Sequence, residues 1–180
     1  MNFCSHCSAP VELRIPDGDS LPRFVCGACH TIHYQNPKII VGCIPEWNNQ
    51  ILLCRRAIEP KIGLWTIPAG FMENHETLAE AAIRETNEEA NANIEIGNLY
   101  AVYSLPHISQ VYVLFRARLI DINFFPGIES LETKLFHEHE IPWNDIAFKV
   151  IHDPLKRFLE ERRQNNIQFH SGVIIRSPSQ

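Results

Sequence analysis

Long apolar runs and an excess of positive charge are both missing from this 180-residue sequence. The longest apolar run near its start, Ile39–Ile44, is far too short to span a bilayer. The first residues contain neither the basic region nor the apolar region of a secretion signal. A net charge of −5 gives no electrostatic reason to expect a nucleic-acid backbone as partner. We therefore expect a cytoplasmic protein that binds neither membranes nor nucleic acids.

Four of the six cysteines form two pairs with the spacing of a zinc site, Cys4-x-x-Cys7 and Cys26-x-x-Cys29. A turn at Pro16–Asp19 would fold the segment between the pairs back on itself. Four thiolates leave no open position on a metal, so the predicted zinc ribbon, over residues 1–34, holds a structural Zn²⁺. Two disulfides are the alternative, and they conflict with the missing secretion signal. His6 and His30, beside the thiolates, are the other candidate ligands.

An acidic helix is predicted after the glycine turn at Gly70. Thr77 and Glu80 have the spacing of a capping box, which starts the helix at Thr77, and Asn91 suits its end. One stripe of this helix begins with apolar residues and ends in three carboxylates, those of Glu85, Glu88 and Glu89. Carboxylates beneath a sheet need a cation, and a hard divalent ion such as Mg²⁺ takes oxygen ligands. The alternative is an acidic helix face in solvent.

The pattern around this helix resembles the Nudix box. Its charged positions are all present at their spacing: Gly70, five residues, Glu76, seven residues, then Arg84-Glu85-Thr86-Asn87-Glu88-Glu89. Thr86 stands where an aliphatic residue is usual, and Asn91 where glycine is usual. Further motifs make nearly the whole chain similar to bacterial relatives of plant plastid FAD/ADP-ribose pyrophosphatases: the ribbon, Tyr34–Pro37, Gly63–Phe71, Gln110, Tyr112 and Pro126–Glu132.

The fold expected for residues 35–180 is a Nudix α/β/α sandwich with a mixed sheet. Apolar and alternating segments predict its strands at Lys38–Ile44, Ile51–Arg55, Leu99–Leu105, Val111–Leu119 and Lys134–His137. Asp153 is expected to cap a final amphipathic helix, Pro154–Arg163. The tail, Ser177–Gln180, is expected to be disordered.

The resemblance implies a metal-dependent pyrophosphatase that hydrolyses the diphosphate link of ADP-ribose or FAD and releases AMP. Carried over by position, it makes Glu85 and Glu89 the main Mg²⁺ or Mn²⁺ ligands, with Glu88 and the carbonyl of Ala69 or Gly70 as further ligands. It gives Arg84 the task of orienting a box glutamate, while Glu76 is expected to be structural. An acidic residue of the loop Asn123–Thr133 is expected to activate the water. Spacing favours Glu129, and Glu132 is the second candidate.

Substrate contacts are expected from two arginines and several aromatic residues. Arg55 and Arg56 are candidates for the phosphates, but neighbouring strand residues face opposite sides of a sheet. Stacking candidates are Trp65, Phe71 and Tyr112, although core packing is the commoner role of any single aromatic residue. Gln110 is assigned to substrate binding through the resemblance, which also implies a homodimer.

Three other functions stay open. The ribbon is also similar to that of NADH pyrophosphatases, although their Ser-Gln-Pro-Trp-type motif is missing after the box. A non-catalytic regulator that senses a nucleotide and binds nucleic acid through its ribbon is the alternative from another class. A structural partner protein that docks through its ribbon is the third. Two features weigh against the regulator: the complete set of box carboxylates, and a ribbon that is not basic, with two arginines against three acidic residues.

Overall fold

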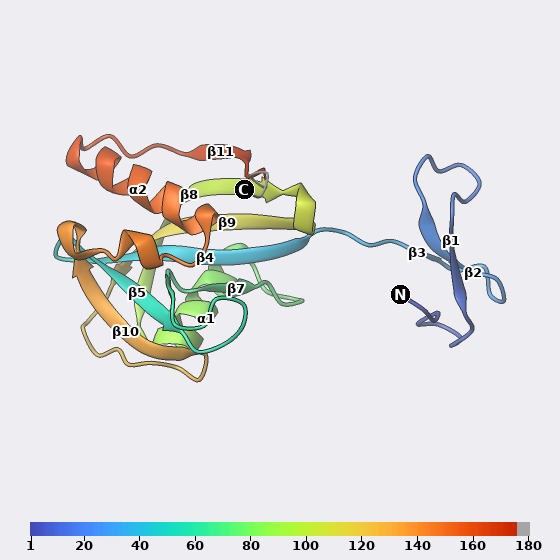
Figure 1. The fold of residues 1–180 in the computed structure, drawn as a ribbon, viewed down its shortest axis with the longest axis horizontal. Helices are drawn as coiled ribbons and strands as arrows, with labels where there is room; N and C mark the ends of the chain where they lie inside the picture. The colour runs from blue at the N-terminus through green and yellow to red at the C-terminus, as the bar shows by residue number, and fades with distance from the viewer. Residues whose placement is uncertain (176–180) are drawn as a thin grey trace. The chain divides into compact units, whose positions relative to one another are not determined.

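The chain divides into two compact units, Met1–Pro37 and the residues from Lys38 onward. The computed structural model describes residues 1–175 (Figure 1), so the predicted disordered tail Ser177–Gln180 lies outside the described residues. Across residues 1–175, no helix has the length and apolar character needed to cross a membrane.

The first unit is a small antiparallel sheet with three strands, β1 (Val11–Arg14), β2 (Arg23–Cys26) and β3 (Ile32–His33). The predicted turn is confirmed, since Val11 pairs with Cys26 and the Asp19 amide donates to the Pro16 carbonyl at 3.1 Å. Few of its side chains are buried, which is too small a core to stabilise the fold alone.

The second unit is built on a mixed sheet with the strand order β10-β5-β4-β9-β8-β11. Its long strands are β4 (Lys38–Trp47), β5 (Gln50–Arg56), β8 (Ile94–Leu105), β9 (Gln110–Leu119), β10 (Ser130–His137) and β11 (His170–Val173). The β4–β9 and β8–β11 pairs are parallel, and the other pairs in this order are antiparallel.

Two helices cover opposite faces of this sheet, α1 (Leu78–Ala90) on one side and α2 (Lys149–Arg163) on the other (Figure 1). Each face has its own apolar core. Small residues of α1, such as Ala81 and Ala82, pack on one face, while α2 contributes the larger Leu155 and Phe158 to the other. The predicted α/β/α sandwich is confirmed.

The sheet divides between β4 and β5, and the gap holds the segment before α1. These two strands pair only near their shared turn, at Glu46–Ile51 and Trp47–Gln50. Beyond it, β5 pairs with β6 (Trp65–Thr66) and β4 pairs with β7 (Ala69–Phe71). The chain leaving β7 is therefore delivered to the start of α1 beside the division of the sheet.

The predicted starts of α2 and β10 are wrong, and several short elements were not predicted. Helix α2 begins at Lys149, five residues before Pro154. Proline in the second turn loses one backbone hydrogen bond, but the extra turn buries Val150 and Ile151. Strand β10 begins at Ser130, so Glu132 lies in a strand and not in the predicted loop. Three-ten helices (short, tight helical turns) occur at Pro106–Ile108, Glu138–Glu140 and Trp143–Asp145, and β11 was not predicted.

Candidate active site

Both ends of α1 are fixed by local contacts, as the sequence predicted. The Thr77 hydroxyl accepts from the Glu80 amide at 3.2 Å, and the Glu80 carboxylate accepts from the Thr77 amide at 2.7 Å. Asn91 ends the helix in the left-handed conformation, with φ of 47°. Thr86 is fully buried, and its hydroxyl donates to the Ala82 carbonyl at 2.7 Å. The threonine therefore fits the packed face without leaving a polar group unpaired.

Two of the three glutamates on α1 are buried. Glu85 and Glu89 are 8% and 7% exposed, whereas the side chain of Glu88 is 58% exposed. The pKa of Glu89 is raised from its usual 4.5 to about 8, mainly by burial and in part by the charge of Glu85. The Ala69 amide opposes this rise by donating to Glu89 Oε2 at 3.3 Å. Burial raises the pKa of Glu85 too, against the attraction of Arg84.

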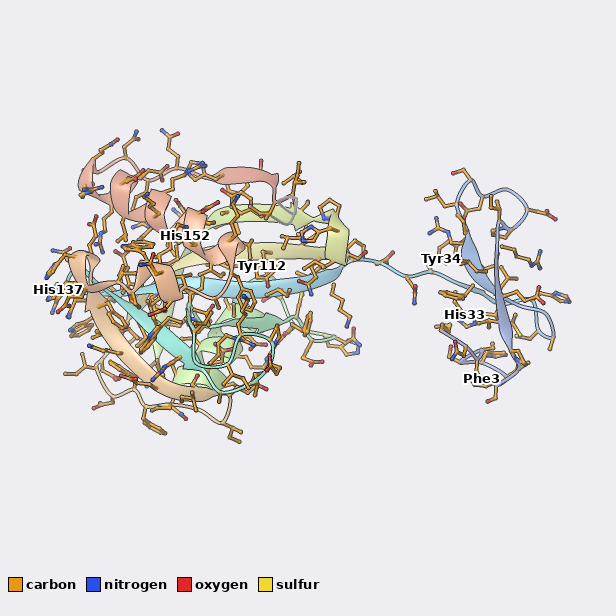
Figure 2. All side chains as sticks on the ribbon, in the orientation of Figure 1. Phe3, His33, Tyr34, Tyr112, His137 and His152 are labelled. Carbon is orange, nitrogen blue, oxygen red and sulfur yellow. The ribbon has the colours of Figure 1, made fainter. Side chains whose placement is uncertain are left out.

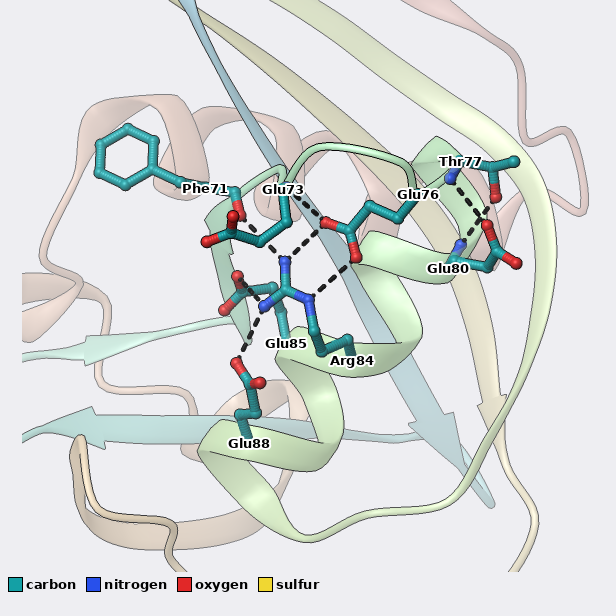
Figure 3. Close-up of polar contacts among 8 residues, drawn as sticks. All are labelled: Phe71, Glu73, Glu76, Thr77, Glu80, Arg84, Glu85 and Glu88. Carbon is teal, nitrogen blue, oxygen red and sulfur yellow. Dashed lines mark hydrogen bonds and ion pairs between the residues drawn. The ribbon is translucent and has the colours of Figure 1, made fainter.

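Arg84 joins the acidic groups around it (Figure 3). Its guanidinium binds both carboxylate oxygens of Glu76, at 3.0 and 2.8 Å, and donates to the Phe71 carbonyl at 3.0 Å. The same group contacts Glu85 at 2.7 Å and Glu88 at 2.9 Å. Arg84 thereby fixes two of the three glutamates relative to the chain before the helix.

Gly70 allows the backbone before α1 to touch the glutamates. A Cβ atom at this position would overlap the Glu85 carboxylate. The Ala69 amide already contacts Glu89. Carboxylate and carbonyl oxygens are the ligands that Mg²⁺ and Mn²⁺ take, and buried carboxylates with a raised pKa gain from a divalent cation. The donor set of Glu85, Glu89 and the backbone at residues 69–70 therefore fits such an ion.

These groups open into one cavity of about 1420 Å³. Most of the site residues predicted from the sequence line this cavity: Arg56, Ala69, Gly70, Phe71, Arg84, Glu85, Glu88, Glu89, Gln110, Tyr112 and Glu129. Tyr112, labelled in Figure 2, lies on β9 and is 9% exposed, while Phe71 is 48% exposed. The cavity thus brings together residues from most of the length of the second unit.

Three predicted residues lie outside this cavity. Trp65 is buried in the core and packs edge-on against Phe136, with 4.9 Å between ring centroids. This places Trp65 in the core, the alternative that the sequence left open, and a stacking role does not fit. Arg55 and Glu132 pair with each other at 3.8 Å, away from the cavity lining. Neither therefore fits its predicted role against substrate.

Arg56 lines the cavity that Arg55 does not, as expected for neighbours on one strand. Its Nε donates to the Pro60 carbonyl at 2.8 Å, and its guanidinium lies 5.1 Å from the centroid of the Phe148 ring. These contacts fix the arginine on the cavity wall.

The loop before β10 is attached to the C-terminal end of α1. The amides of Phe125 and Gly127 donate to the carbonyls of Ala90 and Glu89, at 2.9 and 3.0 Å. A Cβ at Gly127 would overlap the Glu88 carbonyl. Past this contact, the Glu129 carbonyl accepts from the Ala57 amide at 2.8 Å. These hydrogen bonds hold the loop backbone on both sides of Ile128, whose side chain is exposed.

Several cavity residues were missed by the sequence prediction. His107 and Ile108 come from the helical turn after β8, and Phe148 and Lys149 come from the start of α2. Ile174 and Ile175 follow β11 and also line the cavity. The apolar stripe of α2 extends back to Val150 and could have revealed its first turn, whereas β11 has no alternating pattern to mark it.

The paired cysteines form a second cluster, in the first unit. The sulfurs of Cys4, Cys7, Cys26 and Cys29 all lie within 4.8 Å of one another, and none of the six cysteines forms a disulfide. The amides of His6 and Cys29 donate to thiols of the cluster at 3.4 Å. His33, labelled in Figure 2, was not singled out by the sequence, and its Nε2 lies 3.3 Å from Cys4 Sγ. Four converging thiols suit a closed tetrahedral zinc site.

Comparison with known proteins gives two family matches and several close relatives. The Nudix N-terminal family, a zinc ribbon, matches residues 2–35, and the NUDIX domain family matches residues 36–158. A NUDIX hydrolase of known crystal structure from Nitrosomonas europaea is 69% identical, with a TM-score of 0.96, over 98% of this chain and all of that one.

Two curated relatives have more specific names. An ADP-ribose pyrophosphatase of Methanocaldococcus jannaschii is 31% identical over 132 residues, which are 68% of this chain and 76% of the relative. An NAD-capped RNA hydrolase, NudC, of Photorhabdus laumondii is 31% identical over 163 residues, or 85% of this chain. The matched part is 60% of the length of that NudC relative.

Proposed function

We propose that this chain, which belongs to the Nudix hydrolase family, hydrolyses the diphosphate link of ADP-ribose or FAD and releases AMP. The observation that carries the proposal is the pair of buried carboxylates, Glu85 and Glu89, at the wall of a cavity large enough for a dinucleotide. The likeness to an ADP-ribose pyrophosphatase supports this substrate class.

Each residue then has a defined task. Glu85 and Glu89, with Glu88 and the backbone at residues 69–70, hold one or more divalent ions, and Arg84 orients the glutamates. A divalent ion held there, Mg²⁺ or Mn²⁺, would neutralise charge that develops on the phosphate oxygens. Glu129 accepts a proton from the attacking water as the water oxygen bonds to one phosphorus. The bridging P–O bond of the diphosphate breaks, and the other half of the substrate leaves as a monophosphate, so the products are AMP and either ribose 5-phosphate or FMN.

Binding of the substrate falls to side chains around the acidic groups. Arg56 contacts a phosphate, because its guanidinium is fixed on the cavity wall by Pro60 and Phe148. Phe71, Tyr112 and Gln110 contact the organic parts of the substrate, since all three line the same cavity. In the first unit, Zn²⁺ on the four cysteines stabilises the ribbon and takes no part in the reaction.

A panel of substrates tests this proposal. Purified protein is incubated with ADP-ribose, FAD, NADH and a diadenosine polyphosphate, with Mg²⁺ or Mn²⁺, and the products are separated by chromatography. We expect AMP from ADP-ribose or FAD, no turnover without divalent ions, and recovery when they are restored. Failure to cleave any of these compounds under either metal would contradict the proposal and favour the nucleotide-sensing regulator.

The same panel examines the second candidate, an NADH pyrophosphatase. The likeness to NudC over 85% of this chain favours that substrate, although the chain spans only part of that relative. If NADH were cleaved preferentially, to AMP and reduced nicotinamide mononucleotide, it would replace ADP-ribose and FAD as the assigned substrate. Homodimer formation, the lack of a nucleic-acid partner and a cytoplasmic location stay predictions.

A further inference from the structure

The cavity has an apolar end that the reaction does not use. Six of its lining residues are aliphatic and lie away from the glutamates, at the ends of β8 and β11, in the turn after β8 and in the first turn of α2: Leu105, Ile108, Val150, Ile151, Ile174 and Ile175. Ile174 also packs against the core beneath α2. A diphosphate bound to the carboxylates has no group that could use this surface.

The register of the sheet shows how far this end lies from the carboxylates. Phe71 pairs with Ile40, Ile40 with Tyr112, Tyr112 with Tyr103, and Tyr103 with Gly172. This row crosses four strand spacings from β7 to β11, about 19 Å at about 4.8 Å per strand. Gly70, next to Phe71 on β7, lies against the Glu85 carboxylate, so this row of residues starts at the acidic groups. A substrate whose diphosphate binds there reaches the apolar end only with a part far from the diphosphate.

Ile174 lies on the same side of the sheet as the rest of this surface. Gly172 pairs with Tyr103, so it shares the face of Tyr103 and Leu105, and Ile174, two residues later, returns to that face. The Ile174 amide donates to the Ser104 carbonyl at 2.9 Å, which keeps the chain against β8 after β11 ends. Ile175, 76% exposed, forms the rim.

Polar groups beside the aliphatic residues narrow the choice of occupant. His107, Gln110 and Lys149 line the same region and offer hydrogen bonds at its edge. An aliphatic surface edged by a few donors and acceptors suits a flat ring with polar atoms on its rim. An alkyl chain would make no hydrogen bonds with these polar groups.

From this geometry we infer that Ile174 and Ile175, with Leu105 and Ile108, form the binding site for an aromatic ring of the substrate, the adenine or the isoalloxazine. The inference rests on the proposed function for the identity of the substrate. Both isoleucines lie outside residues 36–158, which contain the acidic groups. Their aliphatic side chains can contribute to substrate binding, but not to metal ligation or proton transfer.

Binding of reaction products tests the inference separately from catalysis. Affinities for AMP, FMN and ribose 5-phosphate are measured by calorimetry with Mg²⁺ present, for the wild type and for the variants Ile174→Asp and Ile175→Asp. Ile175→Asp guards against misfolding, because that side chain is mostly exposed. The matched control is Val173→Asp, an exposed neighbour that is absent from the cavity lining.

We expect both isoleucine variants to bind AMP or FMN at least tenfold more weakly, with ribose 5-phosphate changed less than twofold and the control unchanged. Loss confined to AMP identifies the ring as adenine, and loss confined to FMN identifies it as isoalloxazine. Equal loss for ribose 5-phosphate, unchanged affinity for both ring ligands, or no binding of either to the wild type overturns the inference. Failure of the proposed function shows separately, as lack of hydrolysis of ADP-ribose and FAD.

Discussion

The two clusters of metal-ligand residues are held together in opposite ways. The four cysteine sulfurs converge within 4.8 Å of one another, although they come from short turns and the end of β2, in a unit with a very small core. The glutamates are held by one capped helix, but their carboxylates do not converge in the same way. Among residues 1–175, the four cysteines are the only group whose ligand atoms all lie this close together. Arg84 donates hydrogen bonds to two of the glutamates, Glu85 and Glu88, and its positive charge offsets the repulsion between their carboxylates.

This difference indicates which of the two clusters can take part in a reaction. A closed set of four ligands surrounds its ion and leaves no position for water, so it serves the fold. Carboxylates on a rigid helix at a cavity wall leave room for both an ion and a substrate. The fold of the second unit does not depend on the ion, because its sheet and two cores fix the helix.

The largest expected effect is the loss of activity in Glu89→Gln. A neutral amide is a poor ligand for a hard cation, so we expect kcat to fall by about a thousandfold or more. The zinc content of the ribbon should not change. Kinetics with ADP-ribose and FAD, together with elemental analysis, measure both effects. Glu95→Gln is the control, because Glu95 pairs with Arg118 on the exposed surface. Near-normal turnover in Glu89→Gln would refute its assignment as a ligand.

A smaller loss should separate the two candidates for the base. Glu129 lines the cavity, whereas Glu132 pairs with Arg55 outside it. We expect Glu129→Gln to lower kcat roughly a hundredfold with KM little changed, and Glu132→Gln to stay within a few-fold of the wild type. Steady-state kinetics at saturating metal decide between them. If both variants keep their activity, the water is activated by the metal and the box residues alone.

The ribbon should be less important for catalysis than either carboxylate. Cys26→Ser removes one of four ligands, so we expect the zinc to be lost and the ribbon to unfold. The second unit has its own cores, and we expect kcat/KM to fall less than about tenfold. Elemental analysis and kinetics measure the two results, with Cys43→Ala, in the other unit, as the control that keeps its zinc. Full zinc content in Cys26→Ser would refute the predicted site.

Local signals made the acidic helix predictable, because the capping residues Thr77 and Glu80 and the terminal Asn91 lie in or beside it. The side of the sheet that Trp65 or Glu132 faces depends on where β4 and β5 separate. The strand pairs formed there involve residues from separate segments of the chain, so no local pattern predicts them. The strand β11 is fixed by parallel pairing with β8 and by a 2.6 Å contact between His170 and Glu161. Neither contact leaves a pattern within the strand itself.

The smallest expected effect concerns the stability of the second unit without its divalent ion. The pKa of Glu89 is about 8 in the folded protein and 4.5 when exposed, so between these values the folded state binds more protons than the unfolded state. The stability that Glu89 contributes is therefore fully present below pH 4.5 and is lost as the pH rises through 8. Divalent ions should reverse the loss, because they bind the ionised carboxylate.

Thermal unfolding of protein freed of Mg²⁺ and Mn²⁺, with its zinc retained, measures this effect. Between pH 5 and 9 we expect the wild type to lose on the order of 5 °C in Tm relative to Glu89→Gln, which has no carboxylate to ionise at this position. All other titrating groups are common to both proteins, so the difference between the two curves isolates Glu89. Mg²⁺ should raise the Tm of the wild type at pH 9 and not that of the variant. Parallel curves would show that Glu89 is not held in the buried state that makes it a candidate metal ligand.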